Sequence, residues 1–251
     1  MSRRLKTLEF AQMTLLAKVE DALTSIDVEG GTPDKLLGDD LGMDSQELLC
    51  AAVDFEQIFG VKIADGELHR KMSVLDLAML ISRKRVSQRT LGSFDHSLSE
   101  DIAINARLED VYAGLFNFQA WPEKLPHVRS VNTRYNDGVF QEFDMEVLDG
   151  KGGVISVRSV RRCEPERIRF FQPQPPKFTR HHCGEWILTA LGQDITHVVT
   201  RHAWRLAEAA CEIFPDEHGV PSAERVRSWL AAHARSALDR WKTCLENGAV
   251  Q

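Results

Sequence analysis

The sequence lacks the long apolar run that a membrane-spanning helix requires. None of its apolar stretches approaches the ~18 residues needed to cross a bilayer. The N-terminal segment, Met-Ser-Arg-Arg-Leu-Lys, also lacks the apolar core of a secretory signal. We therefore expect a chain that has no membrane partner and is not exported.

Cysteine is sparse and unpatterned. The five cysteines are odd in number and widely separated, and none forms a CxxC or CxxH spacing. A disulfide framework and a structural zinc site both require closer or paired spacings. We therefore expect no metal site and a reducing, cytoplasmic location.

Three common catalytic motifs are missing as well. The sequence has no GxSxG nucleophile elbow, no GxxxxGK[ST] phosphate loop and no GxGxxG after a predicted strand. Their absence favours cofactor-free chemistry in residues 97–251, the larger part of the chain.

Charge is distributed unevenly along the chain. The net charge is -6, but the window from Glu20 to Leu68 holds thirteen acids and two bases and carries -11, while the remainder carries +5. Such an acidic segment repels phosphate, so we expect no nucleic-acid partner. It would attract basic protein surfaces; the alternative is an acidic surface that is merely solvated.

The hydrophobic pattern divides the chain into two domains joined by a linker. Residues 1–85 have helical spacing, with a helix predicted from about Ser45 to Phe59, ended by Gly60, and a last helix capped by Ser73. The segment from Ser82 to Ser93 is basic and polar, and we place a linker at residues 86–96.

Residues 97–251 have a mixed α and β pattern. A helix is predicted from 108 to 118, alternating strands at 139–147, 154–162, 167–172, 182–191 and 196–206, and a long final helix at 223–246. Val139, Gln141, Phe143, Met145 and Val147 share one face of their strand. This order predicts antiparallel strands beside one long helix.

A short motif precedes the predicted 45–59 helix. Gly42 permits a tight turn, and Ser45 falls at the helix N-terminus, where free N–H groups and the positive dipole end stabilise an anion such as a phosphodiester. The plainer alternative is that Asp44 or Ser45 only caps the helix.

The wider segment resembles the acyl carrier protein family. The resemblance covers about residues 5–85 and rests on Leu36-Leu37-Gly38-Asp39-Asp40-Leu41-Gly42-Met43-Asp44-Ser45 and on the later Phe59-Gly60 pair. It implies an all-α four-helix carrier bundle with 4'-phosphopantetheine attached at Ser45, beside Asp44, by a phosphopantetheinyl transferase. Gln46 and Cys50 depart from the family pattern at positions that affect partner contacts.

The same resemblance gives the acidic window a role. Glu47, Asp54 and Glu56 would form a docking face for basic partners, namely polyketide or fatty-acid synthase enzymes. A flexible arm at Ser45 would raise the effective concentration of its acyl chain at neighbouring sites to roughly the millimolar range.

The second part resembles the START-like polyketide cyclase/aromatase superfamily. The resemblance covers about residues 97–246 and rests on the Trp121-Pro122 segment, the element order and the strand Val154 to Arg161. It implies an α+β helix-grip fold, in which a curved antiparallel sheet surrounds a long C-terminal helix and encloses an apolar cavity.

Strand alternation selects candidate residues for that cavity. Arg161 shares a face with Ile155, Val157 and Ser159 and is the inward candidate; an exposed charge at the strand end is the alternative. Phe143, Trp186 and Trp204 are predicted to form core and cavity wall.

Two further residues are candidates for proton transfer. His202 could be a general base, and a hydrogen-bonded structural histidine is the alternative. Tyr135, beside Asn136-Asp137-Gly138, is a candidate proton donor. Arg161 would stabilise an enolate, because its guanidinium stays charged.

Together the resemblances imply polyketide biosynthesis. The chain would carry an acyl or poly-β-keto chain on phosphopantetheine and fold it for cyclisation and aromatisation in the cavity. A first alternative is a non-catalytic protein that carries and shelters the chain, or presents it to partner enzymes. A second is a START-like domain that serves only as a docking scaffold.

Overall fold

The computed structural model describes residues 13–88, 94–148 and 153–248. The chain forms two compact units that divide at residue 90, and residues 189–197 group with the first unit. Regular structure of the helical part continues to Ser87 and resumes at His96. The middle of the predicted linker, residues 89–93, lies outside the described residues.

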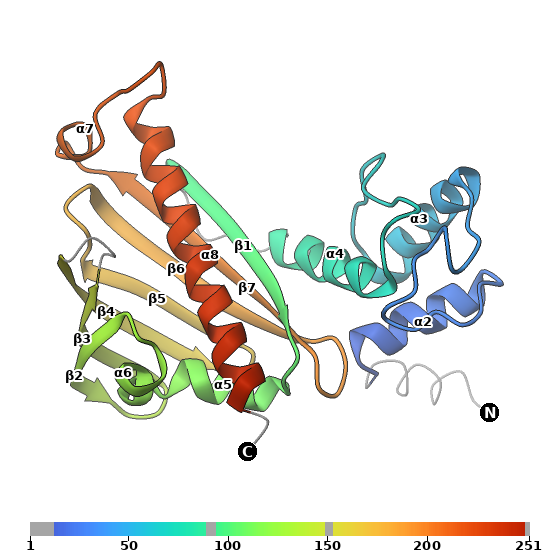
Figure 1. The fold of residues 1–251 in the computed structure, drawn as a ribbon, viewed down its shortest axis with the longest axis horizontal. Coiled ribbons are helices and arrows are strands. Elements are labelled where there is room, and N and C mark those ends of the chain that lie inside the picture. The colour runs from blue at the N-terminus through green and yellow to red at the C-terminus, as the bar shows by residue number, and fades with distance from the viewer. Residues whose placement is uncertain (1–12, 89–93, 149–152, 249–251) are drawn as a thin grey trace. The chain divides into compact units, whose positions relative to one another are not determined.

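The described part of the first unit contains three helices, α2 (Leu15–Ser25), α3 (Ser45–Phe59) and α4 (Val74–Ser87) (Figure 1). The predicted bounds of α3 are confirmed: Asp44 caps its start in a capping box, and Gly60 ends it with a left-handed φ of 67°. Ser73 caps α4, as predicted. The fourth helix of the expected carrier bundle is not found among residues 13–88.

Apolar side chains from all three helices form the core of the first unit. Leu23, Phe55, Leu77 and Ile81 are fully buried. On α3, the apolar Leu49 is 60% exposed, and Ile58 is also exposed. This helix therefore presents apolar as well as acidic side chains to solvent.

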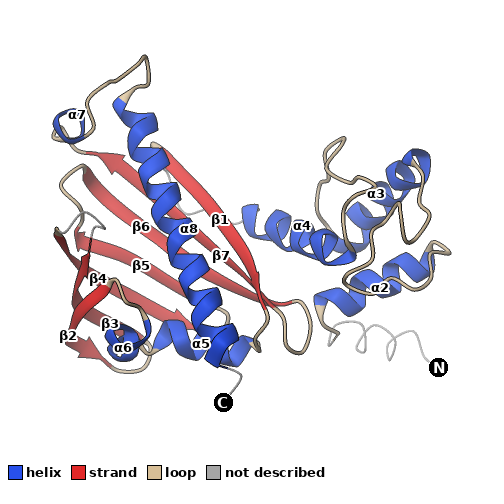
Figure 2. Cartoon of the chain, in the orientation of Figure 1, coloured by secondary structure: helices blue, strands red, loops and turns tan. Residues whose placement is uncertain are grey.

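The second unit is built on one seven-stranded sheet with the order β1-β7-β6-β5-β4-β3-β2 (Figure 2). The described pairings from β2 to β6 are all antiparallel. The strands are β1 (His96–Ile104), β2 (Val128–Asn136), β3 (Phe140–Leu148), β4 (Val154–Glu164), β5 (Arg167–Gln174), β6 (Thr179–Ala190) and β7 (Thr196–Leu206).

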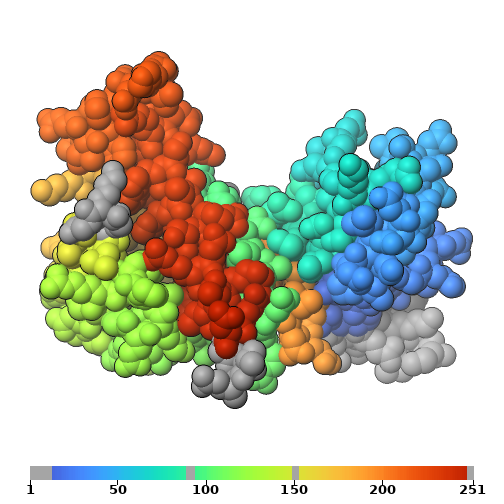
Figure 3. Space-filling model, viewed as in Figure 1, coloured from blue at the N-terminus to red at the C-terminus, as the bar shows by residue number. Residues whose placement is uncertain are grey.

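One long helix, α8 (Ser222–Gly248), runs across one face of this sheet (Figure 1), and its residues, orange to red, form part of the surface in the space-filling view (Figure 3). Leu238 and Trp241 of α8 are buried against sheet residues such as Ile168 and Leu188. Shorter elements close the ends of the unit: α5 (Leu108–Phe116), η1 (Phe118–Ala120), α6 (Trp121–Lys124) and α7 (Ala210–Ile213). This is the helix-grip arrangement that the sequence predicts.

The predicted alternation on β3 and β4 holds. Gln141, Phe143 and Val147 of β3 are buried, as are Val157 and Arg161 of β4. Strand β2 was not predicted, because Val-Arg-Ser-Val-Asn-Thr-Arg-Tyr-Asn is mostly polar and most of its residues are exposed. Within the described ranges, no helix combines the length and the apolar character needed to cross a bilayer.

Candidate functional site

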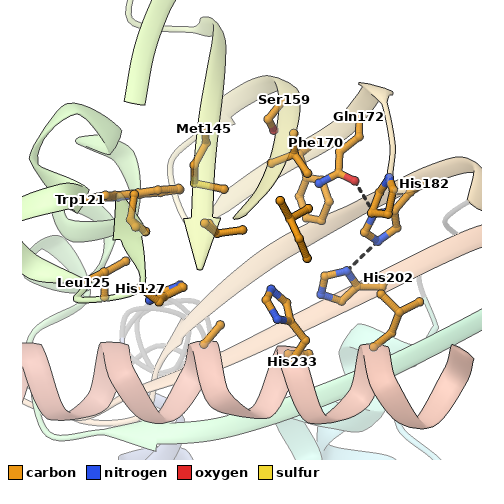
Figure 4. Close-up of a pocket in the computed structure, with 18 of the residues that line it drawn as sticks. Trp121, Leu125, His127, Met145, Ser159, Phe170, Gln172, His182, His202 and His233 are labelled. Carbon is orange, nitrogen blue, oxygen red and sulfur yellow. Dashed lines mark hydrogen bonds between the residues drawn. The ribbon is translucent and has the colours of Figure 1, made fainter. Parts of the chain in front are cut away.

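A cavity of about 170 Å³ lies between the sheet and α8 (Figure 4). Its walls are mainly apolar and aromatic, and no Asp or Glu occurs among the described residues that line it. Apolar walls with few polar groups are typical of small-molecule sites. Its lining includes Trp121, His127, Phe143, Ser159, Arg161, Phe170, Gln172, His182, Trp186, His202, Trp229 and His233.

Arg161 lines the cavity and is only 4% exposed, so β4 turns this side chain inward. Its guanidinium donates from Nη1 to the Leu115 carbonyl at 2.9 Å and from Nη2 to the Phe116 carbonyl at 3.0 Å. Nε donates to Gln141 Oε1 at 3.1 Å, and Nη2 donates to the same oxygen. Of the five N–H groups, one on Nη1 has no partner among the described residues.

Aromatic rings complete the surroundings of this cation. The guanidinium carbon lies 5.1 Å from the ring centre of Phe143, 5.1 Å from that of Trp121 and 5.5 Å from that of Phe118. No carboxylate within the described residues forms an ion pair with Arg161. Burial lowers the pKa of Arg161 to about 10, so it stays cationic at neutral pH. The cavity therefore holds a fixed positive charge without an acidic counter-ion.

A chain of hydrogen bonds runs along a second wall of the cavity (Figure 4). His182 Nδ1 donates to Gln172 Oε1 at 2.6 Å, and His182 Nε2 lies 3.0 Å from His202 Nδ1. His202 Nε2 lies 3.2 Å from the Thr200 hydroxyl. With Gln172 as acceptor, His182 Nε2 accepts from His202, and His202 Nε2 accepts from Thr200. All four ring nitrogens thus have partners, as in the structural-histidine alternative.

Burial keeps these histidines neutral. It lowers the pKa of His182 to about 4 and, together with neighbouring histidines, that of His202 well below its usual range. Burial also lowers the pKa of His127 to about 4 and lowers that of His233, and Arg240 adds to both effects. At neutral pH, Arg161 is therefore the charged group lining the described cavity.

Two sequence-based assignments are corrected. Tyr135 does not reach the cavity: it is 53% exposed, and its hydroxyl donates to Asp137 at 2.9 Å in the turn after β2. Trp204 is fully buried but does not line the cavity, because it packs with Leu98 and Val226 near the start of α8. Trp186 and Phe143 do line it.

Sequence analysis also missed residues that the fold brings to the site. Gln141 pairs with Arg161 in the β3–β4 register and orients its guanidinium; its position among the inward residues of β3 was the available signal. Gln172 lines the cavity from β5, His127 from the position just before β2, and His233 from α8. His233 lies on the apolar stripe of the long final helix, in helical spacing with Trp229 and Ala237, whereas nothing in the local sequence marks Gln172 and His127.

The first unit presents Ser45 at the first position of α3. The side chain is exposed, and its hydroxyl makes no hydrogen bond within the described residues. Asp44 Oδ1 accepts from the backbone N–H groups of Gln46 at 2.8 Å and Glu47 at 2.9 Å, so Asp44 is the cap and Ser45 is free. A groove of about 330 Å³ lies beside Ser45, between α3 and residues 63–70.

The three predicted docking acids differ in their surroundings. Glu47 accepts from the Asp44 backbone N–H at 2.8 Å as the other half of the capping box. Glu56 forms an ion pair with Lys62 at 2.8 Å and accepts from the Ile63 N–H, and both contacts lower its pKa. Asp54 forms no such contact within the described residues. The outer side of α3 thus combines the partly buried Asp54 with the exposed Leu49 and Val53.

The chain is similar in sequence to curated polyketide proteins. It is 28% identical over 202 residues to the actinorhodin polyketide synthase bifunctional cyclase/dehydratase of Streptomyces coelicolor, covering 75% of this chain and 60% of that protein. The granaticin polyketide synthase bifunctional cyclase/dehydratase of Streptomyces violaceoruber is 28% identical over 92 residues, 36% of this chain and 28% of that protein. No protein-family profile matches the chain.

A solved polyketide aromatase/cyclase is similar to the chain in both sequence and fold. The di-domain ARO/CYC BexL from the BE-7585A biosynthetic pathway is 27% identical, with a TM-score of 0.55 over 68% of this chain and 56% of that one. The chain is a homologue of polyketide cyclase/aromatases. The di-domain ARO/CYC StfQ from the steffimycin biosynthetic pathway is 22% identical, with a TM-score of 0.55 over 83% of this chain and 63% of that one. At this identity, the similarity supports the fold and nothing further.

A separate match is to a carrier protein. Over 73 residues the chain is 34% identical to an acyl carrier protein of Thermotoga maritima, covering 28% of this chain and 90% of that protein. The chain spans 60% of the length of the actinorhodin protein.

The neutral state of His182 predicts how stability depends on pH. Its pKa is about 4 in the fold against an ordinary 6.5, so the unfolded chain binds more protons between these values. The free energy of unfolding should therefore fall as the pH is lowered through this window. In His182→Gln, which keeps a hydrogen-bonding side chain, we expect this loss to be smaller by roughly 3 kcal/mol.

Urea unfolding followed by tryptophan fluorescence measures this effect. All five tryptophans lie in the second unit, so the signal reports on the unit that holds His182. The same pH dependence in both proteins would contradict a neutral, buried His182.

Proposed function

We propose that this homologue carries an acyl or poly-β-keto chain on 4'-phosphopantetheine at Ser45 and folds it in the cavity for cyclisation and aromatisation. The observation that carries the proposal is Arg161, a buried cation without an acidic partner in an apolar cavity. Similarity to named cyclase/dehydratases and to an acyl carrier protein supports the two halves of the proposal.

The chemistry suits such a cation. In an intramolecular aldol closure, a CH₂ group between two carbonyls loses a proton, and the enolate carbon bonds to a second carbonyl carbon. That carbonyl oxygen takes up a proton, and later loss of water gives the aromatic ring. Arg161 would stabilise the enolate oxygen through its free Nη1–H, and its fixed position costs little reorganisation.

The size and walls of the cavity fit a ring-forming step. A dry cavity of about 150 Å³ can hold a benzene ring, and this one has about 170 Å³. A chain folded against Phe143, Trp186 and Trp121 would bring two of its carbons together, which is the positioning part of catalysis.

The proposed proton transfer is assigned to His202, whose two ring nitrogens already have hydrogen-bond partners. His202 is the proposed proton acceptor through Nε2, whose 3.2 Å contact with Thr200 is the longest in the hydrogen-bond chain. The occupied ring nitrogens favour the alternative function, in which the cavity shelters the chain and presents it unchanged to partner enzymes.

The Ser45 site fits the proposed prosthetic group. Its hydroxyl is exposed and free at the start of α3, where the positive end of the helix dipole favours an anion, and the adjacent groove can receive part of an arm. When bound, the group supplies a thiol that holds the acyl chain as a thioester. The proposed partners are a phosphopantetheinyl transferase and polyketide synthase enzymes; Asp54, Leu49 and Val53 offer them a contact surface.

Modification at Ser45 is tested by intact-protein mass spectrometry. After incubation with coenzyme A and a phosphopantetheinyl transferase, we expect one phosphopantetheine mass increment on the wild-type chain and none on Ser45→Ala. Ser73→Ala, which removes the cap of α4 and leaves α3 intact, is the matched control and should be modified. An unchanged wild-type mass would remove the carrier role.

The cyclase role is tested by product analysis with Arg161 variants. Arg161→Ala should reduce cyclised product by about 100-fold, the usual loss when an oxyanion donor is removed. Arg161→Lys keeps the charge and should retain part of the activity. Arg162→Ala, which removes an exposed arginine on the opposite face of β4, should behave as wild type.

Tryptophan fluorescence and circular dichroism confirm that each of these variants is folded. Equal cyclisation by folded Arg161→Ala and wild type would exclude Arg161 from the mechanism. A loaded chain that wild type leaves chemically unchanged would favour the sheltering function.

A further inference from the structure

The cavity continues toward the surface between α8, the end of β3 and the start of β4, where Leu148 and Arg240 are exposed. A second hollow, of about 230 Å³, shares His127 and His233 with the cavity and continues past them to Ser236 and Arg240. His233, Ser236 and Arg240 follow a spacing of three and four residues, so they lie along one face of α8. We call the four residues His127, His233, Ser236 and Arg240 the mouth.

The mouth carries positive charge and hydrogen-bond donors. No Asp or Glu lines it among the described residues. Arg240 is exposed and forms no ion pair or hydrogen bond with any described residue, and its charge lowers the pKa of both His127 and His233. A guanidinium without an ion-pair partner attracts an anion.

His127 adds an observation that points to a ligand. Its Nδ1 atom is buried from solvent, and no described residue offers it a hydrogen-bond partner. A buried polar atom without a partner is costly, and a bound ligand is one way to satisfy it. The neutral ring can donate from Nδ1 to an oxygen held by Arg240.

We infer that the mouth binds the phosphodiester of the phosphopantetheine arm while the acyl chain occupies the cavity. This inference rests on the proposed function and names the part of the substrate that the protein recognises outside the cavity. Arg240 makes the charge-assisted contact, and His127 and Ser236 donate to the remaining phosphate oxygens. The apolar walls beyond Trp229 and His233 exclude the charged group from the interior.

The test compares two soluble substrates that differ only in the phosphate. One is an acyl thioester of pantetheine 4'-phosphate, and the other is the same thioester of pantetheine. For wild type we expect a KM about ten-fold lower for the phosphorylated substrate, as one charge-assisted hydrogen bond provides. Arg240→Ala should reduce this ratio to about one and leave the KM of the pantetheine thioester unchanged.

Two further variants serve as controls for the charge and the position of Arg240. Arg240→Lys keeps the charge and should retain part of the preference, whereas Arg180→Ala removes an exposed arginine that lines neither hollow and should retain all of it. Equal KM values for the two substrates on wild type would overturn the inference. So would an Arg240→Ala effect that is the same for both.

Direct binding separates this inference from the proposed function. Isothermal titration of pantetheine 4'-phosphate, which has no acyl chain, measures the mouth without any turnover. Binding that is lost in Arg240→Ala supports the inference even if no cyclised product forms, in which case the proposed cyclase function fails alone. Turnover of both thioesters without phosphate preference, and no binding of pantetheine 4'-phosphate, would leave the proposed function standing and overturn the inference.

Discussion

The second unit depends on how it accommodates one buried cation. Removing a guanidinium from water costs several kcal/mol, and here no ion pair with a described carboxylate offsets that desolvation free energy. Two backbone carbonyls, the Gln141 side chain and three aromatic faces do so instead. The same contacts join the end of α5 and the following η1–α6 segment to β3 and β4, so one wall of the cavity forms around Arg161.

This arrangement separates charge from acid–base chemistry. The positive charge is fixed and cannot be neutralised by a neighbouring acid, while the histidines on the other wall are neutral and hydrogen-bonded to one another. Such a site is suited to stabilising negative charge that develops on a substrate oxygen. In the proposed function, the carrier unit adds what the cavity lacks, a tether that keeps the substrate at a high local concentration.

Sequence reasoning predicted the local features well and the tertiary ones less well. The limits of α3, its cap and the inward face of β4 follow from spacing and capping chemistry, which act over a few residues. The exposure of Tyr135 and the enclosure of Trp204 depend on where the turn after β2 and the start of α8 come to lie. The Gln172–His182–His202 chain joins three strands, so no local pattern could have marked it.

The central claim, that the cavity favours an anionic substrate oxygen through Arg161, is tested most directly by the ionisation of a bound phenol, whose oxygen anion resembles that of an enolate. A nitrophenol is small enough for the cavity, and its ionised form absorbs at longer wavelength, so an absorbance titration gives its pKa free and bound. The account predicts a bound pKa below the free value, with the shift lost in Arg161→Ala. An unchanged or raised pKa, as burial in an apolar cavity without an effective cation would give, would contradict it.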